Sequence, residues 1–447
     1  MEKEKRLVKK RELLMAIFVL FLVMLALYKY HPQIINAAEE FFIQLYEKYD
    51  IRFGTCPDNQ IRINVVDGYL CRNEIKEESV YSKIYDAYPK KSNGKEIIYS
   101  FLDSGDISIA DDLLKDIHSL ERYEPVKIDD LTWEENPYDE RYWRFLFYSL
   151  RNLRHLIYAE KMTGDKVYLE KLRDISQSFI DEAMEKPAAW EDYHSVAFRS
   201  MVLVNIWWKL RQKNLLTIEY SEELLRAIEK HGEFLADEEH FQPEHNHGVN
   251  QAISLFLISY NFPNFPNSAS WRELALKRLE DGLASLIDDD GVLIENSPYY
   301  QFYVLQKYWE ILEYSKEQHV EIEKNLEEKI YRMMDYSANI IQPNLELPLL
   351  GASLKQTIRY AADMKEIADV YPPLLYALTQ GEKGEKLPDA VYYPIAGQTI
   401  MRSEGKKRYL DKTYLVFDSG PYRTTHSDLD ALHFSLYSND ITLLPDS

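Results

Sequence analysis

The feature that most limits the fold of this chain is a long region of helical periodicity, from Asn136 to about residue 385. Apolar residues recur there at three- and four-residue spacing, which is typical of amphipathic helices. We predict helices over the segments 141–162, 167–184, 196–212, 221–236, 249–260, 271–287, 300–314 and 322–340. The connections are short, so successive helices are expected to run antiparallel. Since no fixed-period repeat is visible, the pattern favours a closed (α/α) toroid of helix pairs over a solenoid.

The pattern changes to a two-residue alternation after Leu387. The segments 391–403, 408–420, 431–438 and 440–447 alternate as antiparallel strands do. The predicted fold class is therefore mainly α, with the start of an antiparallel β-sandwich at the C-terminal end. Its predicted parts are an irregular lead-in at 31–125, the toroid at 126–386 and an incomplete β-domain at 387–447.

Residues 1–30 are predicted to form a single-pass transmembrane signal-anchor. A basic start, MEKEKRLVKKRE, is followed by LLMAIFVLFLVMLALY, which carries no charge. At about 1.5 Å per residue this run is about 24 Å long, somewhat short of a bilayer core. The alternative is a cleaved signal peptide, with Ala37 or Ala38 at the cleavage position. In both cases the remainder is expected outside the cytoplasm, either extracellular or periplasmic.

The two cysteines suit an exported chain. Cys56 and Cys71 flank a strand–turn–strand pattern whose turn is Asp67-Gly68. We predict a disulfide between them, because exported pairs at such spacing are usually oxidised. Two buried free thiols are the alternative, and the absence of a CxxC pattern disfavours a metal site.

Composition restricts the partners. The chain has 53 Lys and Arg against 74 Asp and Glu, a net charge of −21. This balance argues against nucleic acid as a ligand, because neutralising phosphates needs the opposite sign. An anionic polymer is a suitable substrate only if its cleft is locally basic. The 34 Tyr and 7 Trp residues suit sugar surfaces, although many must belong to the core.

Polar side chains precede several of the predicted helices. Helices entered at Asn136, Trp190, Asn246 and Ser297 are alternate members of the series, so antiparallel packing starts them at one end. Ser297-Pro298 is a helix-start signal, which places Tyr299 and Tyr300 in a first turn. The side chains expected to collect at this end are Trp143, Arg199, Asn246, His247 and Tyr300.

Such a group suits β-elimination next to a sugar carboxylate. The proton beside the carboxylate becomes removable only when that charge is neutralised. Asn246 is predicted to neutralise it, helped by His247 or Arg199. Tyr300 is the predicted acid for the leaving oxygen. It also serves as base if the helix end and neighbouring cations lower its pKa.

From Trp133 to the last residue, motifs occur in a familiar order. They are W-E-E-N-P at 133–137, W-E-D-Y-H-S-V-A-F-R at 190–199, N-H-G-V-N-Q at 246–251, D-G-V-L-I-E-N-S-P-Y-Y at 290–300, GPYRTTHSDLDALHFSLY at 420–437 and L-L-P-D-S at 443–447. Together they resemble the heparinase II/III family of polysaccharide lyases, which includes some alginate lyases. The resemblance implies a toroid followed by a β-sandwich, with a cleft between them and an anionic, uronate-containing polysaccharide as substrate.

The resemblance also implies roles for individual residues. Asn246 neutralises the carboxylate, His247 and His426 act as base or support, and Tyr300 is the acid/base. The predicted substrate contacts are Trp143, Tyr193, His194, Arg199 and Tyr299.

No cofactor is required by this chemistry, but some members bind a structural zinc. The family motif His-x-His-x-Asp-x-Leu-x-Phe has Asp428 here in place of its second His, and the later Asp is Asp446. Two carboxylates make a harder site that zinc favours less. The chain also stops at Ser447 where the family continues, so a fragment with an unpaired sheet edge is expected.

Other interpretations remain open at this point. Asn246 suits a helix cap, Tyr300 suits the core, Arg199 suits an ion pair with Glu191 or Asp192, and His426 suits a plain ion-pair cluster. A toroid glycoside hydrolase would need a carboxylate pair such as Asp192 with Glu295. A non-catalytic polysaccharide-binding or exopolysaccharide-assembly protein is the third hypothesis.

Overall fold

A computed structural model describes residues 52–56, 60–65, 68–73, 80–87, 104–243, 246–317, 320–322, 324–351, 353–403, 408–421 and 432–444. Side chains are described from residue 80 onward. The chain divides into two compact units, Met1–Glu78 and Ser79–Ser447.

The first unit contains a three-stranded antiparallel sheet. Its strands are β1 (Arg52–Cys56), β2 (Gln60–Val65) and β3 (Gly68–Asn73), paired in the order β1-β2-β3. The predicted strand–turn–strand between the cysteines is confirmed, since β2 and β3 pair in register from Gln60 opposite Asn73. The side chains of Cys56 and Cys71 lie outside the described residues, so their disulfide stays a prediction.

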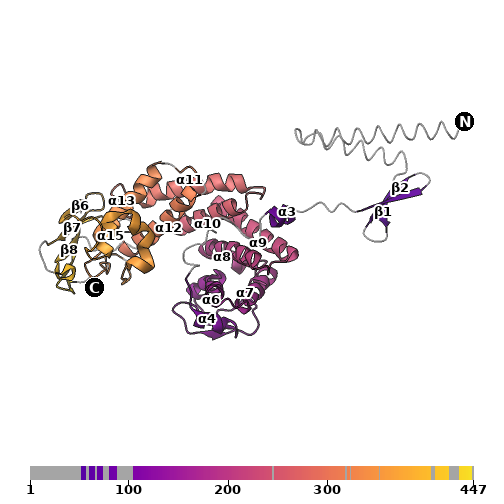
Figure 1. Ribbon diagram of the computed structural model, residues 1–447, viewed down its shortest axis with the longest axis horizontal. Coiled ribbons are helices and arrows are strands. Elements are labelled where there is room, and N and C mark those ends of the chain that lie inside the picture. Colours follow the sequence, from indigo (N-terminus) through magenta and orange to yellow (C-terminus); the bar gives the residue numbers. More distant parts are fainter. Residues whose placement is uncertain are drawn as a thin grey trace. The chain divides into compact units, whose positions relative to one another are not determined.

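The second unit is mainly helical (Figure 1). Its α-helices are α3 (Val80–Ala87), α4 (Ile107–Leu113), α5 (Arg141–Tyr148), α6 (Arg154–Thr163), α7 (Val167–Ser178), α8 (Tyr193–Gln212), α9 (Ile218–Ala236), α10 (Asn246–Asn261), α11 (Ser268–Leu286), α12 (Pro298–Glu317), α13 (Lys324–Ile340), α14 (Lys365–Val370) and α15 (Pro372–Leu378). Short 3-10 or π turns lie at Arg151–Leu153, Phe179–Ala183, Pro187–Ala189, Glu238–His240, Tyr360–Met364 and Tyr409–Asp411. Helices α3 and α4 lie within the segment predicted to be an irregular lead-in.

The long helices pack against their neighbours in the chain and, for α8 and α10, against the next helix but one. Helix α10 contacts α8, α9 and α11, and α12 contacts α13. Both α8 and α10 are buried around most of their circumference, because apolar or small residues occupy nearly every position of each. They form the centre of the helical core, and Trp207 and Trp208 of α8 are buried there.

One predicted helix is wrong in its extent. The segment 141–162 breaks at Leu150, which adopts a left-handed φ of 55°. A leucine in that region interrupts the helical hydrogen-bond ladder, so α5 ends at Tyr148 and α6 begins at Arg154. The start predicted at Asn136 is also early, since Asn136 Oδ1 accepts a hydrogen bond from the Glu140 N–H in a turn before α5.

A five-stranded antiparallel sheet follows the helices. Its strands are β6 (Ala390–Tyr393), β7 (Gln398–Arg402), β8 (Tyr414–Asp418), β9 (His433–Ser438) and β10 (Ile441–Leu444), in the order β10-β9-β8-β7-β6. A two-stranded ribbon, β4 (Ile117–His118) with β5 (Val126–Lys127), precedes α5.

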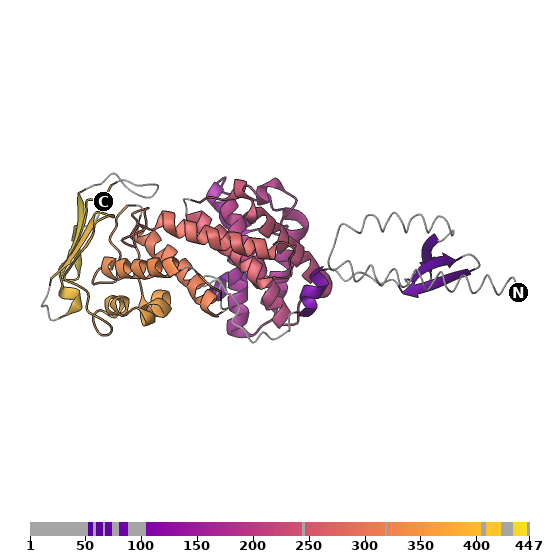
Figure 2. The same cartoon turned by 90° about the horizontal axis from the view of Figure 1, so that it is seen from above.

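One face of this sheet packs against α13, as Figure 2 shows from above. Tyr414 donates to the Ile340 carbonyl, and Tyr336 of α13 donates to Gln398 of β7. Helices followed by an antiparallel sheet are confirmed. The closed ring of helices and the second sheet of a sandwich stay predictions, because the described elements do not establish them.

Within the described residues, no helix is both long and apolar enough to cross a membrane. The predicted anchor at 1–30 lies outside them.

Candidate functional site

The N-terminal ends of α8, α10 and α12 meet, as the alternation of helices predicts. The ring of His194, in the first turn of α8, stacks on that of His247, in the first turn of α10, with 3.9 Å between ring centroids. The ring of Phe145, on α5, also stacks on the ring of His194, with 5.3 Å between the ring centroids. We call His194, Asn246, His247, Asn250, Tyr300 and Tyr303 the amino-end cluster.

Asn250 joins the three helices of this cluster. Its Nδ2 donates to His194 Nε2 at 2.9 Å and to the Asn246 carbonyl at 3.1 Å. The hydroxyl of Tyr303, on α12, donates to Asn250 Oδ1 at 3.2 Å. Because an amide nitrogen only donates, His194 Nε2 accepts, and the proton of the neutral ring sits on Nδ1.

The tautomer of His247 follows from the same reasoning. Its Nδ1 lies 3.0 Å from Gln242 Oε1, which only accepts, so Nδ1 carries the proton and Nε2 is the basic nitrogen. Gln242 is held by Gln251, whose Oε1 accepts from the Gln242 N–H at 3.0 Å. Gly248 allows this approach, since a Cβ there would lie 2.1 Å from the Gln242 carbonyl oxygen.

Asn246 is a different kind of amide from Asn250. It is buried at the start of α10, and its Oδ1 has no hydrogen-bond partner among the described residues. A buried acceptor without a partner costs about 1–3 kcal/mol. Such a cost is tolerated where a ligand supplies the missing bond.

Tyr299 and Tyr300 lie in the first turn of α12, as predicted, with their rings edge to face at 5.1 Å. The predicted cap differs in detail: the Tyr299 N–H donates to Ser353 Oγ at 3.3 Å, and Ser297 Oγ contacts that same hydroxyl. Burial raises the pKa of Tyr300, and Tyr299 and Glu295 raise it further, against the opposing charge of Arg122. The condition for a Tyr300 base, a lowered pKa, is therefore not met, and the phenol stays protonated at neutral pH.

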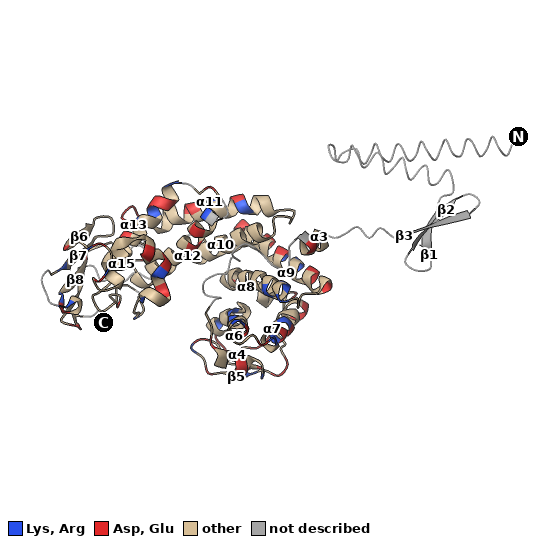
Figure 3. Cartoon of the chain, viewed as in Figure 1, with Lys and Arg blue, Asp and Glu red and all other residues tan. Residues whose placement is uncertain are grey.

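Cations surround the tyrosines of this end. Arg122 lies over the Tyr142 ring at 5.1 Å, and Arg151 over the Phe198 ring at 4.6 Å. The charge of Arg151 acts on Tyr303, whose pKa burial raises to about 12. Along α11, acidic and basic residues are interspersed (Figure 3). Carboxylates lie near the tyrosines as well, since the charges of Glu295 and Glu310 act on Tyr300 and Tyr303. The amino-end cluster thus has two arginines within electrostatic reach in an acidic chain.

The predicted substrate contact of Arg199 is wrong. Arg199 is fully buried on another side of α8, where it donates to His231 Nε2 at 2.9 Å and to the carbonyls of Tyr148 and Ala189 at 2.7 and 2.6 Å. Neither Glu191 nor Asp192 is its hydrogen-bond partner. The guanidinium fastens α8 to α9 and α5.

Two predicted aromatic contacts also belong elsewhere. Trp143 is completely buried and stacks on Phe147 at 4.7 Å, so it is part of the core. Tyr193 packs edge to face on Phe234 and His240, at 5.5 and 5.0 Å, on the α9 side of α8. The side chain that α8 contributes to the cluster is His194 instead.

The carboxylates of the hydrolase hypothesis have other tasks. Asp192 Oδ1 caps α8 by accepting from the Ser195 N–H at 2.9 Å, and Oδ2 lies 3.5 Å from Arg141. Glu295 is buried before α12. The cap and the arginine occupy Asp192, which weighs against an acid–base pair.

The predicted roles of His426, Asp428 and Asp446 fall outside the described residues. In the part that is described, no group of three or more His, Cys, Asp or Glu could hold a metal ion. Zinc therefore stays a sequence-based expectation.

Sequence reasoning missed Asn250, Tyr303, Tyr142 and Arg151. The spacing of Asn250 from Asn246 is one helical turn, which signals a shared face. Tyr303 is one turn beyond Tyr299 for the same reason. Arg122 and Arg151 lie outside the long helices, so their approach has no local signal.

Comparison with known proteins adds to this geometry. Residues 82–374 match the family model "Heparinase II/III N-terminus". A heparin-sulfate lyase of Pedobacter heparinus is 21% identical over 337 residues, which cover 71% of this chain and 49% of the lyase. The chain thus spans about half the length of this curated relative.

Solved structures are similar in fold. A crystal structure of heparinase III has a TM-score of 0.72 at 17% identity, covering 82% of this chain and 62% of that one. The heparan sulfate lyase HepC from Pedobacter heparinus has a TM-score of 0.63 at 18% identity, covering 82% and 59%.

Proposed function

Because the chain belongs to the heparinase II/III family, we propose that its amino-end cluster cleaves a uronic-acid-containing polysaccharide by β-elimination. The observation that carries this proposal is the meeting of two stacked imidazoles, His194 and His247, with the Asn250 amide and the Tyr303 hydroxyl at the starts of α8, α10 and α12. The protonated phenol of Tyr300 lies in the first turn of α12, three residues before Tyr303. These groups suit proton transfer beside a carboxylate.

Neutralising the uronate is the first requirement. We assign this to Asn246, whose amide Nδ2 can donate to a carboxylate oxygen. Its buried Oδ1, without a partner among the described residues, is then left to accept from a sugar hydroxyl. An amide hydrogen bond to the carboxylate, together with the nearby charges of Arg122 and Arg151, stabilises the enediolate that forms when the adjacent proton leaves. These two arginines supply local positive charge for an anionic polymer in a chain whose net charge is −21.

Proton removal then falls to a histidine. The Gln242 contact makes Nε2 the basic nitrogen of His247, which takes the proton from the carbon next to the carboxylate. The electron pair of that C–H bond forms the new C=C bond, and the bond from the neighbouring carbon to the glycosidic oxygen breaks. The resemblance assigns His426 a supporting role in this step.

Tyr300 protonates the departing oxygen. Its raised pKa keeps the phenol protonated at neutral pH, which an acid needs and a base does not. His194 and Tyr299 flank this pair and are proposed to contact the sugar rings.

We also keep the proposal that residues 1–30 anchor the protein with its catalytic part outside the cytoplasm. Its test is fractionation with protease protection: the full chain should be found with membranes and be digested from outside. Recovery of intact, protected protein would refute it.

The proposed activity is tested by incubating the full chain with alginate, heparan sulfate, hyaluronan, chondroitin sulfate and pectate. Ultraviolet absorbance of an unsaturated uronate should rise with at least one polymer. Asn246→Ala should abolish the rise, whereas Asn214→Ala, in the turn after α8, should not. Absorbance that stays flat on all five, from folded protein, would favour the binding-protein hypothesis.

A further inference from the structure

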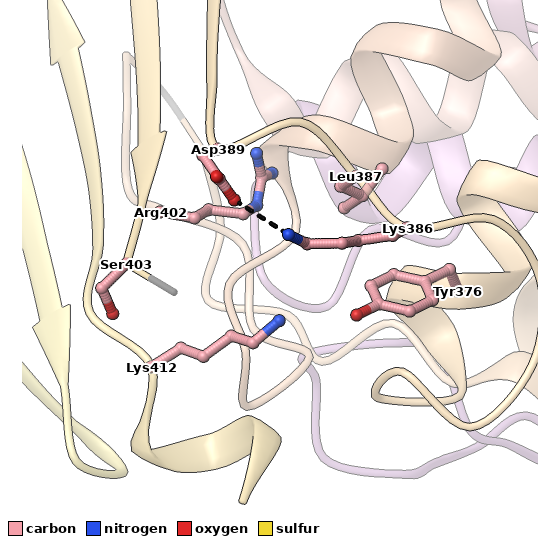
Figure 4. A pocket seen from close by; sticks show the side chains of 7 residues that line it. All are labelled: Tyr376, Lys386, Leu387, Asp389, Arg402, Ser403 and Lys412. Carbon is pink, nitrogen blue, oxygen red and sulfur yellow. Dashed lines mark ion pairs between the residues drawn. The ribbon is translucent and has the colours of Figure 1, made fainter. Parts of the chain in front are cut away.

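A cavity of about 300 Å³ lies between α15 and the sheet, apart from the amino-end cluster (Figure 4). It is lined by Tyr376, Lys386, Leu387, Asp389, Arg402, Ser403 and Lys412. Its size is at the lower end of the range for small-molecule sites, enough for one sugar unit.

Positive charge dominates this lining. Three cations face one carboxylate, Asp389, which is paired with Lys386 at 3.4 Å. Lys412 makes no ion pair with any described carboxylate. Its ammonium lies over the rings of Tyr409 and Tyr376, at 4.4 and 5.6 Å from their centroids. The cavity therefore carries an excess positive charge in a chain whose total is −21.

The cations are held in place by the fold. Arg402 donates to Asn339 Oδ1 at 3.2 Å, to the Pro388 carbonyl at 3.4 Å and to the Asn339 carbonyl, and it lies over the Tyr414 ring at 5.4 Å. Two of the five N–H donors of its guanidinium remain for a ligand. Ser403 Oγ accepts from the Thr413 N–H at 2.8 Å, which fixes the hydroxyl at the wall. Figure 4 shows the Lys412 ammonium and the Tyr376 hydroxyl pointing into the space between these walls. Fixed donors lose little freedom when an anion binds.

The cavity is distinct from the amino-end cluster. Gln398, at one end of β7, donates to Asn296 just before α12. Arg402 is at the other end of β7, four residues further, which is about 13 Å along a strand.

We propose that this cavity is an accessory subsite for an anionic sugar unit, with Lys412, Lys386 and Arg402 receiving a carboxylate or sulfate group and Tyr376 packing on the ring. Cations and an aromatic wall match that chemistry, since charge-assisted bonds hold the anion and the ring gives an apolar face. The inference that an anion binds here depends only on the cations of the cavity. The inference that the anion belongs to a sugar depends on the proposed function.

The test is calorimetric titration of the full chain carrying Tyr300→Phe, so that the probe is not consumed. Two disaccharide probes separate the anion sources: one from heparan sulfate, with carboxylate and sulfate, and one from heparosan, with carboxylate only. Inorganic sulfate tests the anion without a sugar. The variants compared are Lys412→Gln and, as matched control, Lys324→Gln, which removes an exposed charge at the start of α13.

Two molecules of a disaccharide probe should bind each chain of the control. Lys412→Gln should raise the Kd of one of these two sites by about tenfold and leave the Kd of the other unchanged. A heparosan probe that shows the same loss assigns the carboxylate, and loss with heparan sulfate alone assigns the sulfate. If the proposed lyase function fails, the control binds one disaccharide and Lys412→Gln still weakens it. Equal binding to both variants with every probe overturns the subsite.

Discussion

Two histidine clusters of the helical core are built from similar groups but differ in how completely they are bonded. Around Arg199 and His231, each polar group has a protein partner: the guanidinium donates to one imidazole and two carbonyls, and His231 Nδ1 lies 2.7 Å from the Ala227 carbonyl. The amino-end cluster is half-exposed and keeps a buried acceptor, Asn246 Oδ1, without a partner in the described part of the chain.

The difference teaches how to separate structural from functional polar groups. A fully bonded buried cluster has no bonding capacity left for a ligand, so it stabilises the fold. An incompletely bonded cluster beside solvent carries a cost that folding alone does not explain. Residue types alone place Arg199 and His247 in one class, whereas their contacts place them in two.

The largest expected effect on activity comes from a substitution in the amino-end cluster. Tyr300→Phe removes the proposed acid while keeping the ring, and we expect kcat to fall by about 10²–10⁴-fold with binding retained. Steady-state kinetics on the best substrate measures this. Tyr331→Phe, on exposed α13 surface, should leave kcat unchanged. Full activity of Tyr300→Phe would remove the acid from the proposed mechanism.

The fully hydrogen-bonded cluster around Arg199 and His231 is tested by the substitution Arg199→Met. The change leaves three buried acceptors unsatisfied, so we expect the free energy of unfolding to fall by about 3–5 kcal/mol. Chemical denaturation measures the loss, and KM of the folded fraction should stay the same. A raised KM at unchanged stability would return Arg199 to the substrate.

Another buried histidine, His155, extends the comparison to the dependence of stability on pH. Asp106 N–H donates to His155 Nδ1 at 2.9 Å, so the ring must be neutral, and burial lowers its pKa to about 4. The folded state therefore binds fewer protons than the unfolded state between pH 6.5 and about 4. This contribution is complete above pH 6.5 and is lost as pH falls, by about 3 kcal/mol in total.

Denaturation at pH 7 and pH 4.5 checks this dependence. His155→Gln keeps an acceptor but cannot titrate, so its stability should fall less over that interval. Equal pH dependence in both proteins would contradict the assignment.

The smallest expected effect is at Gln242, which positions His247 and does not touch substrate. Gln242→Leu removes the acceptor that fixes the tautomer, and we expect about a tenfold fall in kcat/KM. The acidic limb of the pH profile should also move, because the hydrogen bond to His247 is lost. An unchanged profile would show that the Gln242 contact has no part in proton transfer.

Part of this architecture was readable in the sequence. The starts of α10 at Asn246 and α12 at Pro298 were predicted from polar residues and a proline ahead of apolar runs, because such signals are local. The antiparallel alternation then brought Asn246, His247 and Tyr299–Tyr300 to one end.

The rest depended on contacts that no local pattern contains. Which side of α8 faces the cluster is decided by its packing against α5, α9 and α10. That packing leaves His194 partly buried and buries Arg199 completely. The same holds for Trp143, which packing buries completely although it lies in the first turn of α5. The pKa of Tyr300 depends on the same packing, because burial raises it and outweighs the neighbouring cation.

The most direct test of the central claim is the mass of the products from a purified oligosaccharide substrate of the full chain. Elimination adds no water, so the two product masses should sum to that of the substrate, and one product should carry an unsaturated uronate. Products heavier by one water in total would mean hydrolysis, and would contradict a β-elimination site at the starts of α8, α10 and α12.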